Sequence, residues 1–255
     1  MQILISCAKT MAEDYTVHTP TSTLPLFEEE ANRQALQMAD MSLEEMEKCL
    51  RVNRAIALEN QIRYRHFHNE DTKRMPALLA YTGIVFKRIH PEDFTADDFL
   101  FAQEHLNITS FLYGLLRPLD TIRNYRMEGD VVLPENNGLT MFGYWQSRLT
   151  DGFIQKIKKD DGILVNLASD EMKRLFDWKR LCKEVRVITP EFKVRKGDKL
   201  RTIVIYTKMC RGEMTRYLLK QRLTQPEDIK QFSWEGFGWN ESESKGDKWM
   251  FSGEG

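Results

Sequence analysis

The chain lacks any long apolar run. Its longest apolar stretches, 163–167 and 203–206, are the length of β-strands, whereas a membrane-spanning helix needs about 20 consecutive apolar residues. The amino terminus reaches Lys9 without the basic first region and the long apolar second region of a secretory signal. We therefore expect a soluble, cytoplasmic protein with no membrane partner.

Cysteine is scarce, and none of the four cysteines belongs to a CxxC pair. This spacing argues against a zinc site and against a disulfide framework, so we expect reduced thiols, no bound metal and no other cofactor. Cys7 and Cys210 nevertheless lie close to lysine or arginine in the sequence, and a neighbouring cation can lower a thiol pKa and make the thiol reactive toward oxidants. We expect packing in the core for both thiols, with this reactivity as the alternative.

Low-complexity tracts, Gly/Ser linkers and fixed-period repeats are also absent from the sequence, so nothing marks a domain boundary. A chain of 255 residues with 42% hydrophobic content can bury a sizeable core. We therefore predict a single large domain over 1–255. Its last part, 235–255, is rich in Gly, Ser and Trp and is expected to be loop-like or frayed.

Helix starts are the clearest local signals. Ser42 with Glu45, and Thr95 with Asp98, have the spacing of a capping box, in which side chain and backbone at the first turn bond reciprocally. The predicted helices cover 42–59, 95–105 and 212–223, and a fourth begins at Thr224.

Strands are indicated by short buried-looking runs rich in β-branched residues. These runs and the predicted helices intermingle without strict alternation of strand and helix. We therefore predict the α+β class, with a mixed β-sheet surrounded by helices, rather than a doubly wound sheet. The predicted strands cover 2–6, 163–167, 185–189 and 202–207.

Charge is nearly balanced overall, at a net −1, so affinity for nucleic acid would depend on uneven distribution. Between Glu13 and Glu47 there are nine acidic residues, and Arg33 is the one Lys or Arg. Between Arg195 and Arg222 there are nine basic residues against two acidic ones. The second region would attract a polyanion, although a solvated basic strand and helix is the alternative interpretation.

Polar side chains follow three predicted strands, where the strand ends of a sheet commonly form a ligand crevice. Because these strand ends are expected to meet, we predict that Lys9, Ser169 and Lys208 line one cavity. We also predict that a helix begins beside Lys208, so that its amino terminus strengthens an anion site there. Helix capping is the alternative role of Ser169. The three clusters contain Ser6, Lys9 and Thr10; Asn166, Ser169 and Glu171; and Lys208 and Arg211.

A fourth polar stretch covers 106–120 and continues to Tyr125 and Arg126. Its glycine, proline and arginines suit a helix-turn-helix or a hairpin that grips a phosphate backbone. A structural turn held by a pair between Arg117 and Asp120 is the alternative.

Several rare strings occur together in these stretches, namely ISCAKT, AQEHL, LYGLLRPLD, VNLASDE and YTKMCRG. In their order and spacing they closely resemble signatures of the YaaA family of bacterial peroxide-stress proteins, and the resemblance runs from Ile3 to about Gly238. It implies protection against hydrogen peroxide by limiting free iron and DNA damage. It also implies a likeness to DNA-binding proteins with a helix-hairpin-helix element and a positively lined cleft.

Three positions depart from the family pattern. Cys7 stands where the family usually has proline, Phe111 replaces a usual glycine, and 81–86 lacks the acid and tyrosine of the GDVY pattern. The resemblance otherwise singles out Ser6, Lys9, Thr10, Tyr113, Arg117, Asp120, Arg126, Asn166, Ser169, Glu171, Lys208 and Arg211.

Three function classes follow. The leading one is a DNA-binding protein that contacts duplex or distorted DNA mainly through phosphates. The second is an enzyme acting on a nucleobase or N-glycosidic bond, with Asn166, Ser169 or Glu171 as catalytic candidates. The third is an iron-handling protein, for which His66 and His68 are the pair to test. The predicted nucleic-acid-binding residues are Lys9, Thr10, Arg117, Arg126, Lys208, Arg211 and Arg216.

Overall fold

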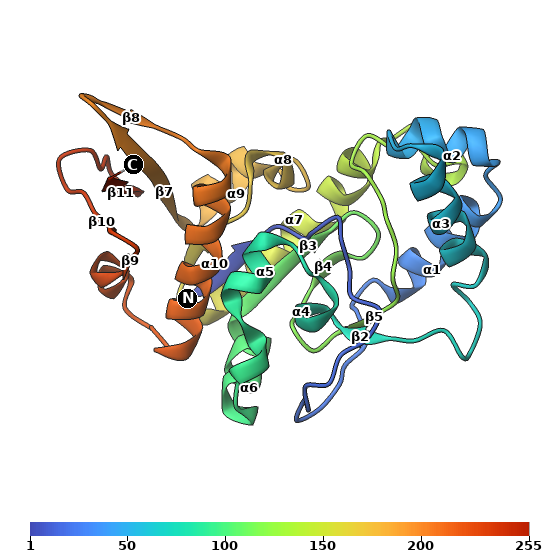
Figure 1. Ribbon diagram of the computed structural model, residues 1–255, viewed down its shortest axis with the longest axis horizontal. Coiled ribbons are helices and arrows are strands. Elements are labelled where there is room, and N and C mark those ends of the chain that lie inside the picture. The colour runs from blue at the N-terminus through green and yellow to red at the C-terminus, as the bar shows by residue number, and fades with distance from the viewer. Residues whose placement is uncertain (255) are drawn as a thin grey trace.

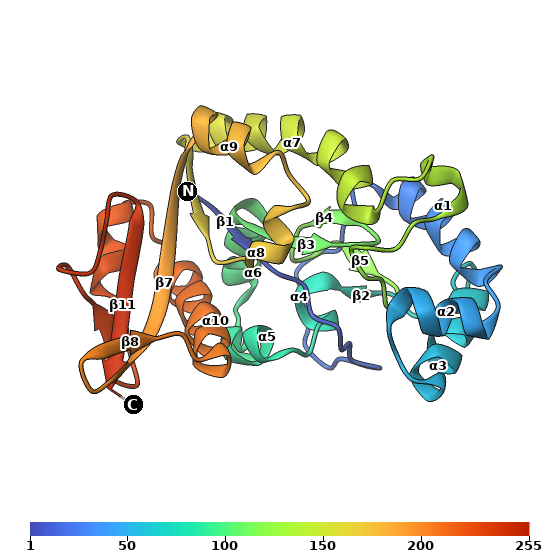
Figure 2. The same cartoon turned by 90° about the horizontal axis from the view of Figure 1, so that it is seen from above.

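Short aliphatic runs from both ends and the middle of the chain form one sheet. The computed structural model describes residues 1–254, and the sheet has nine strands in the order β4-β3-β1-β6-β7-β11-β10-β9, with β8 beside β7 (Figures 1 and 2). The strands are β1 (Gln2–Ile5), β3 (Leu106–Ser110), β4 (Gly114–Leu116), β6 (Ile163–Asn166), β7 (Arg186–Lys196), β8 (Lys199–Arg201), β9 (Ser233–Trp234), β10 (Phe237–Trp239) and β11 (Lys248–Glu254).

The central strands β3, β1, β6, β7 and β11 run parallel, and the strands at the edges are antiparallel. Ile3 of β1 lies between Leu106 of β3 and Val165 of β6. All four residues of β1 are buried, as expected for a parallel strand covered on both faces. The mixed sheet and its surrounding helices are confirmed, but the class is α/β rather than α+β. The long segment between β1 and β3 hides the alternation in the sequence.

Helices cover both faces of the sheet. Figure 2 shows α7 and α9 on one side and α5, α6 and α10 on the other, while α1, α2 and α3 lie at the end far from β8. The helices are α1 (Glu28–Ala39), α2 (Leu43–Leu50), α3 (Arg54–Arg65), α4 (Ala77–Ala80), α5 (Ile84–Ile89), α6 (Ala96–His105), α7 (Met141–Asp160), α8 (Asp170–Lys173), α9 (Trp178–Glu184) and α10 (Val204–Lys220). A separate small sheet pairs β2 (Met75–Pro76) with β5 (Thr121–Ile122).

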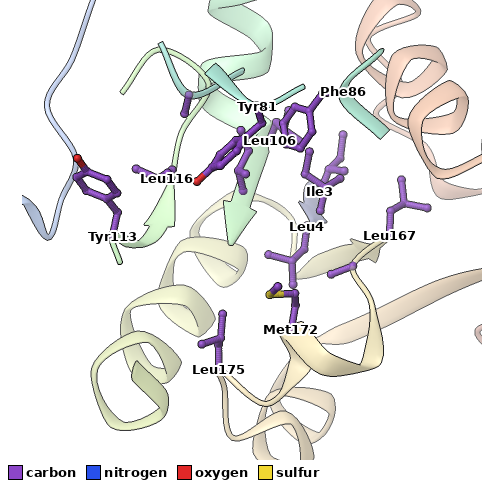
Figure 3. Packing of buried hydrophobic residues seen from close by; sticks show 14 of the residues in the cluster. Ile3, Leu4, Tyr81, Phe86, Leu106, Tyr113, Leu116, Leu167, Met172 and Leu175 are labelled. Carbon is purple, nitrogen blue, oxygen red and sulfur yellow. The ribbon is translucent and has the colours of Figure 1, made fainter. Parts of the chain in front are cut away.

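The core is continuous across the sheet. Figure 3 shows Ile3 and Leu4 near Leu167, with Met172 and Leu175 below them. These side chains are buried, and removing their apolar surface from water favours the folded state. Among residues 1–254, no helix is long and apolar enough to cross a membrane.

Both predicted capping boxes are present. The Ser42 hydroxyl accepts from the Glu45 N–H, and the Thr95 hydroxyl accepts from the Asp98 N–H. The helix from Thr95 ends at His105 as predicted. The helix from Ser42 ends at Leu50 instead of continuing to 59, because Arg51 adopts a left-handed conformation and Asn53 caps the separate helix α3. The chain after Thr224 forms a 3₁₀ turn over Pro226–Gln231.

The predicted strand at 202–207 is wrong, because α10 already begins at Val204. Strand propensity is a weak guide here, since Cys210, Met214 and Leu218 give the helix a buried face that decides its conformation. Gly212, expected near the helix start, lies in its interior. A Cβ atom there would lie 2.4 Å from the carbonyl oxygen of Val85, so this glycine lets α10 pack closely on α5.

The carboxyl end is also different from the prediction of a loop-like or frayed segment. Strand β11 pairs in parallel with β7 over its whole length and antiparallel with β10. Trp249, Met250 and Phe251 are buried in succession. A run of adjacent large apolar residues is typical of a strand covered on both faces, which the glycine and serine content of the region concealed.

The stretch 106–116 forms a β-hairpin, not a helix-turn-helix. Strands β3 and β4 pair antiparallel, with Ser110 opposite Gly114. Gly114 has φ +72°, and a Cβ there would lie 2.8 Å from the ring of Trp145. Phe111 is buried in this turn. The stretch is therefore part of the main sheet, and a helix-hairpin-helix element is not located there.

Candidate functional site

A cavity of about 440 Å³ lies beyond the carboxyl ends of β1 and β6. We call it the basic cavity, because Lys9, Arg126, Lys208 and Arg211 all line it. The predicted meeting of Lys9, Ser169 and Lys208 in one cavity is confirmed. Ser6, Thr10 and Glu171 line the same cavity.

The two strand-end motifs are joined by hydrogen bonds. The Ser6 hydroxyl accepts from the backbone N–H of Ser169 at 2.9 Å and donates to the Ser169 hydroxyl at 3.3 Å. Ser169 precedes α8, yet its side chain forms no capping hydrogen bond. The alternative role of Ser169 as a side-chain cap is therefore not adopted, and its hydroxyl faces the first motif.

Helix α10 supplies two cations from its middle. Lys208 and Arg211 are three residues apart, so they lie on one face of the helix, and both line the basic cavity. The predicted contribution of a helix amino terminus beside Lys208 is wrong, because α10 begins four residues earlier. The anion-binding capacity of this wall therefore depends on side chains rather than on free backbone N–H groups.

The cations of the basic cavity differ in their partners. Lys9 pairs with Glu128 at 2.7 Å, and Arg126 pairs with the same carboxylate at 3.1 Å. Lys208 is exposed, and neither it nor Arg211 forms an ion pair with any residue in 1–254. Two of the four cations thus share one carboxylate, and the other two have none.

Arg211 is partly buried, in contrast to the exposed Lys208. Its Nε atom is buried without a hydrogen-bond partner among the described residues, as is the Nε atom of Arg126. Burial lowers the pKa of the guanidinium, and Asp170 opposes that shift. A buried N–H without an acceptor is costly, so an anion that accepts from Arg211 would relieve an energetic penalty.

The three catalytic candidates separate in space. Ser169 and the exposed Glu171 line the cavity, but Asn166 is buried and does not. The Asn166 side-chain oxygen accepts from the Ala168 N–H at 3.2 Å, which shapes the chain after β6. The Asn166 oxygen therefore holds the backbone, while its Nδ2 atom is buried without a hydrogen-bond partner among the described residues.

Two predicted nucleic-acid-binding arginines lie outside the basic cavity. Arg117 donates to the buried carboxylate of Asp120 at 2.7 Å, which is the structural pair considered as an alternative. Arg216 donates to Asp93 at 2.8 Å and to the carbonyl oxygen of Ile89 at 3.1 Å. Both arginines hold turns of the fold together.

The two thiols near the cations pack against the core, as expected. Cys7 lines the basic cavity, whereas Cys210 is buried in α10 and does not. Burial, with Glu171 nearby, raises the pKa of Cys7 to about 12. Burial, with Glu213 nearby, raises the pKa of Cys210 to about 12. The alternative of a lowered thiol pKa is wrong for both, so each is a protonated thiol at neutral pH.

Sequence reasoning missed two contributors to the site. Glu128 pairs with both Lys9 and Arg126, and its place only two residues after Arg126 was a usable signal. Tyr125 lines the cavity, and its hydroxyl hydrogen-bonds to those of Tyr81 at 2.7 Å and Ser110 at 2.6 Å. This buried chain of hydroxyl groups fixes one wall of the basic cavity.

The histidines are not part of this site. The described part of the chain brings together no group of three or more His, Cys, Asp or Glu side chains that could hold a metal ion. His66 ends α3 and His68 follows it, on the far side of the molecule from α10 (Figure 1).

The fold and the cavity define an α/β protein with a basic cavity at its strand ends. The model of the family described as Peroxide stress protein YaaA matches residues 1–243, so the chain belongs to the YaaA family. A UPF0246 protein of Bacteroides fragilis is 60% identical over 99% of this chain and 98% of its own. One of Bacteroides thetaiotaomicron is 61% identical over 98% of both chains. One of Saccharophagus degradans is 33% identical over 99% of both chains.

Proposed function

We propose that this protein protects DNA during oxidative stress by binding its phosphate groups in the basic cavity. The observation that carries the proposal is the pair of cations on α10, Lys208 and Arg211, which face the cavity without a carboxylate partner in the described chain. Arginine and lysine are the usual donors to DNA phosphates. A bound phosphate would supply the acceptor that Arg211 lacks.

The volume of the cavity favours distorted DNA over a regular duplex. About 440 Å³ falls within the range of small-molecule sites. An intact duplex could only present its backbone at the mouth of the cavity, whereas a nucleotide displaced from the stack could enter it. Displacing a nucleotide costs least where it is mismatched or unpaired, so we expect higher affinity for DNA with an unpaired nucleotide.

The test is the salt dependence of DNA affinity, measured by fluorescence anisotropy with a labelled duplex carrying one unpaired nucleotide. Each lost phosphate contact lowers the slope of log affinity against log salt by roughly one unit. The double variant Lys208→Gln with Arg211→Gln should therefore lose about two units of slope, and its affinity at moderate salt should fall about 10-fold or more.

A matched control removes two charges from another helix. Lys179 and Lys183 lie on α9, are exposed and do not line the basic cavity. Replacing both by glutamine should leave slope and affinity nearly unchanged. Urea unfolding of both variants shows whether they are folded. A folded Lys208→Gln, Arg211→Gln variant with the slope of the unchanged protein would refute the proposal.

A second candidate function rests on Glu171. Its carboxylate lines the same cavity as Ser6 and Ser169, where it could protonate a leaving base or orient water in cleavage of an N-glycosidic bond. Chromatography of oligonucleotides after incubation would reveal a released base. Release that disappears in Glu171→Gln would favour an enzyme, and DNA binding without any released base would favour the binding protein.

A further inference from the structure

A second cavity of about 560 Å³ lies between 24–27, β4 and α7, away from the basic cavity. We call it the α7 cavity. Its wall is largely apolar and includes Phe27, Leu149 and Phe153. At its rim, Leu26 is 77% exposed. An apolar hollow bordered by an exposed leucine is suited to a ligand that buries hydrocarbon.

Two cations in the wall of this cavity, Lys156 and Arg148, have no carboxylate partner among residues 1–254. Lys156 of α7 is half-buried and lines the cavity, and its Nζ donates to the side-chain oxygen of Asn107 at 2.7 Å. That amide is held in place, because its Nδ2 donates to the Gln2 side chain at 3.0 Å and to the Ile3 carbonyl at 3.1 Å. Lys156 forms no ion pair with a carboxylate in 1–254.

The neighbouring charges do not cancel that of Lys156. Arg117 also lines the cavity, and its guanidinium pairs with the Asp120 carboxylate at 2.7 Å. The guanidinium of Arg148 lies over the ring of Tyr144 at 3.7 Å and donates to the Tyr144 carbonyl oxygen at 2.9 Å. Burial and Arg117 lower the pKa of Lys156 to about 8, while Glu104, Asp120 and Asp160 act in the opposite direction.

We propose that the α7 cavity binds a small amphipathic carboxylate, whose head group pairs with Lys156 and whose hydrocarbon body lies against the apolar wall. The charge argument selects the head group: an uncompensated, half-buried ammonium favours an anion. The wall selects the body, because the transfer of CH₂ groups from water to an apolar wall is favourable. This site is independent of nucleic-acid binding in the basic cavity.

The experiment compares octanoate with 1-octanol by isothermal titration calorimetry at pH 7. The two probes share a hydrocarbon chain and differ in charge. Lys156→Met should weaken octanoate binding about 10-fold and leave 1-octanol binding nearly unchanged. Lys159, on the same helix, is exposed and does not line the cavity, so Lys159→Met should bind octanoate like the unchanged protein.

A pH series supplies the second measurement. Octanoate keeps its charge between pH 7 and 9, whereas Lys156, with a pKa near 8, loses its proton over this interval. Affinity for octanoate should therefore fall several-fold in the unchanged protein and persist in Lys156→Arg. Absence of saturable octanoate binding, equal loss of both probes in Lys156→Met, or a flat pH profile in the unchanged protein would each overturn the proposal.

Discussion

Both cavities contain a cation without a carboxylate partner, but they differ in the groups that share the space. In the basic cavity, Lys208 and Arg211 face a space shared with Lys9, Arg126 and several hydroxyl groups. In the α7 cavity, Lys156 lies in a largely apolar wall beside Arg148 and the paired Arg117 and Asp120. The first arrangement suits a polyanion with little apolar surface, and the second suits one negative charge attached to hydrocarbon. The environment of a cation therefore decides which ligand it favours.

The same comparison explains the arginines outside the basic cavity. Arg117 and Arg216 are fully engaged by Asp120 and Asp93 and by backbone carbonyl groups. Such contacts hold together segments that are far apart in the sequence. For example, Arg117 donates to the carbonyl oxygen of Leu24. An arginine in a basic stretch is thus available to a ligand only where the fold leaves it without an internal partner.

The largest effect is expected at Gly212, which sets the distance between α10 and α5. A Cβ at Gly212 would lie 2.4 Å from a backbone oxygen, whereas one at Gly152 in α7 would meet no atom within 4 Å. Gly212→Ala should therefore lower the free energy of unfolding by about 3 kcal/mol and weaken DNA binding by displacing Lys208. Gly152→Ala should raise it by about 0.5–1 kcal/mol.

Urea unfolding of both alanine variants measures this difference. Two variants that change stability in the same direction would contradict the account of how α10 is positioned.

A smaller effect is expected in the pH dependence of stability, and it comes from Lys156 in the α7 cavity. The pKa of Lys156 is about 8 in the folded state against 10.5 as its ordinary value. Between these values the unfolded chain binds more protons, so the stability of the unchanged protein rises with pH. The free energy of unfolding of the unchanged protein, compared with that of Lys156→Met, should therefore rise by about 2 kcal/mol between pH 7.5 and 10.

Denaturant unfolding at intervals of pH checks the expectation, with Lys159→Met as the reference for titrations elsewhere. A constant difference between the unchanged protein and Lys156→Met over this interval would show that Lys156 is not desolvated by its wall.

The smallest effect concerns the thiols. Although Cys7 lines the basic cavity, burial and the nearby Glu171 raise its pKa and keep the thiol protonated. Cys182 is the exposed cysteine, so iodoacetamide near neutral pH should modify it well before Cys7 or Cys210, as followed by mass spectrometry of peptides. Hydrogen peroxide should not link Cys7 to Cys210. Modification of Cys7 as fast as that of Cys182 would show that the cavity activates its thiol.

The sequence predicted those features that depend on neighbouring residues. The capping boxes at Ser42 and Thr95, the strands after residues 1 and 162, and the meeting of the strand-end motifs are all present. Each depends on local hydrogen bonding or on the common direction of parallel strands.

The features that the sequence did not reveal depend on distant partners. Helix α10 is helical because of its buried contacts, although its first residues favour strands. Strand β11 exists because β7 and β10 flank it. Glu128 neutralises Lys9 from 119 positions away, so the division of the cations into paired and unpaired could not be predicted from spacing.

The most direct test of the central claim is a crystal structure of the protein bound to a short DNA duplex with one unpaired nucleotide. A phosphate oxygen should accept a hydrogen bond from Arg211 Nε, with Lys208 Nζ contacting the same or the next phosphate, and Glu128 should remain paired with Lys9. DNA bound along the β7–β8 hairpin, with the basic cavity unchanged and Arg211 still without an acceptor, would contradict the account.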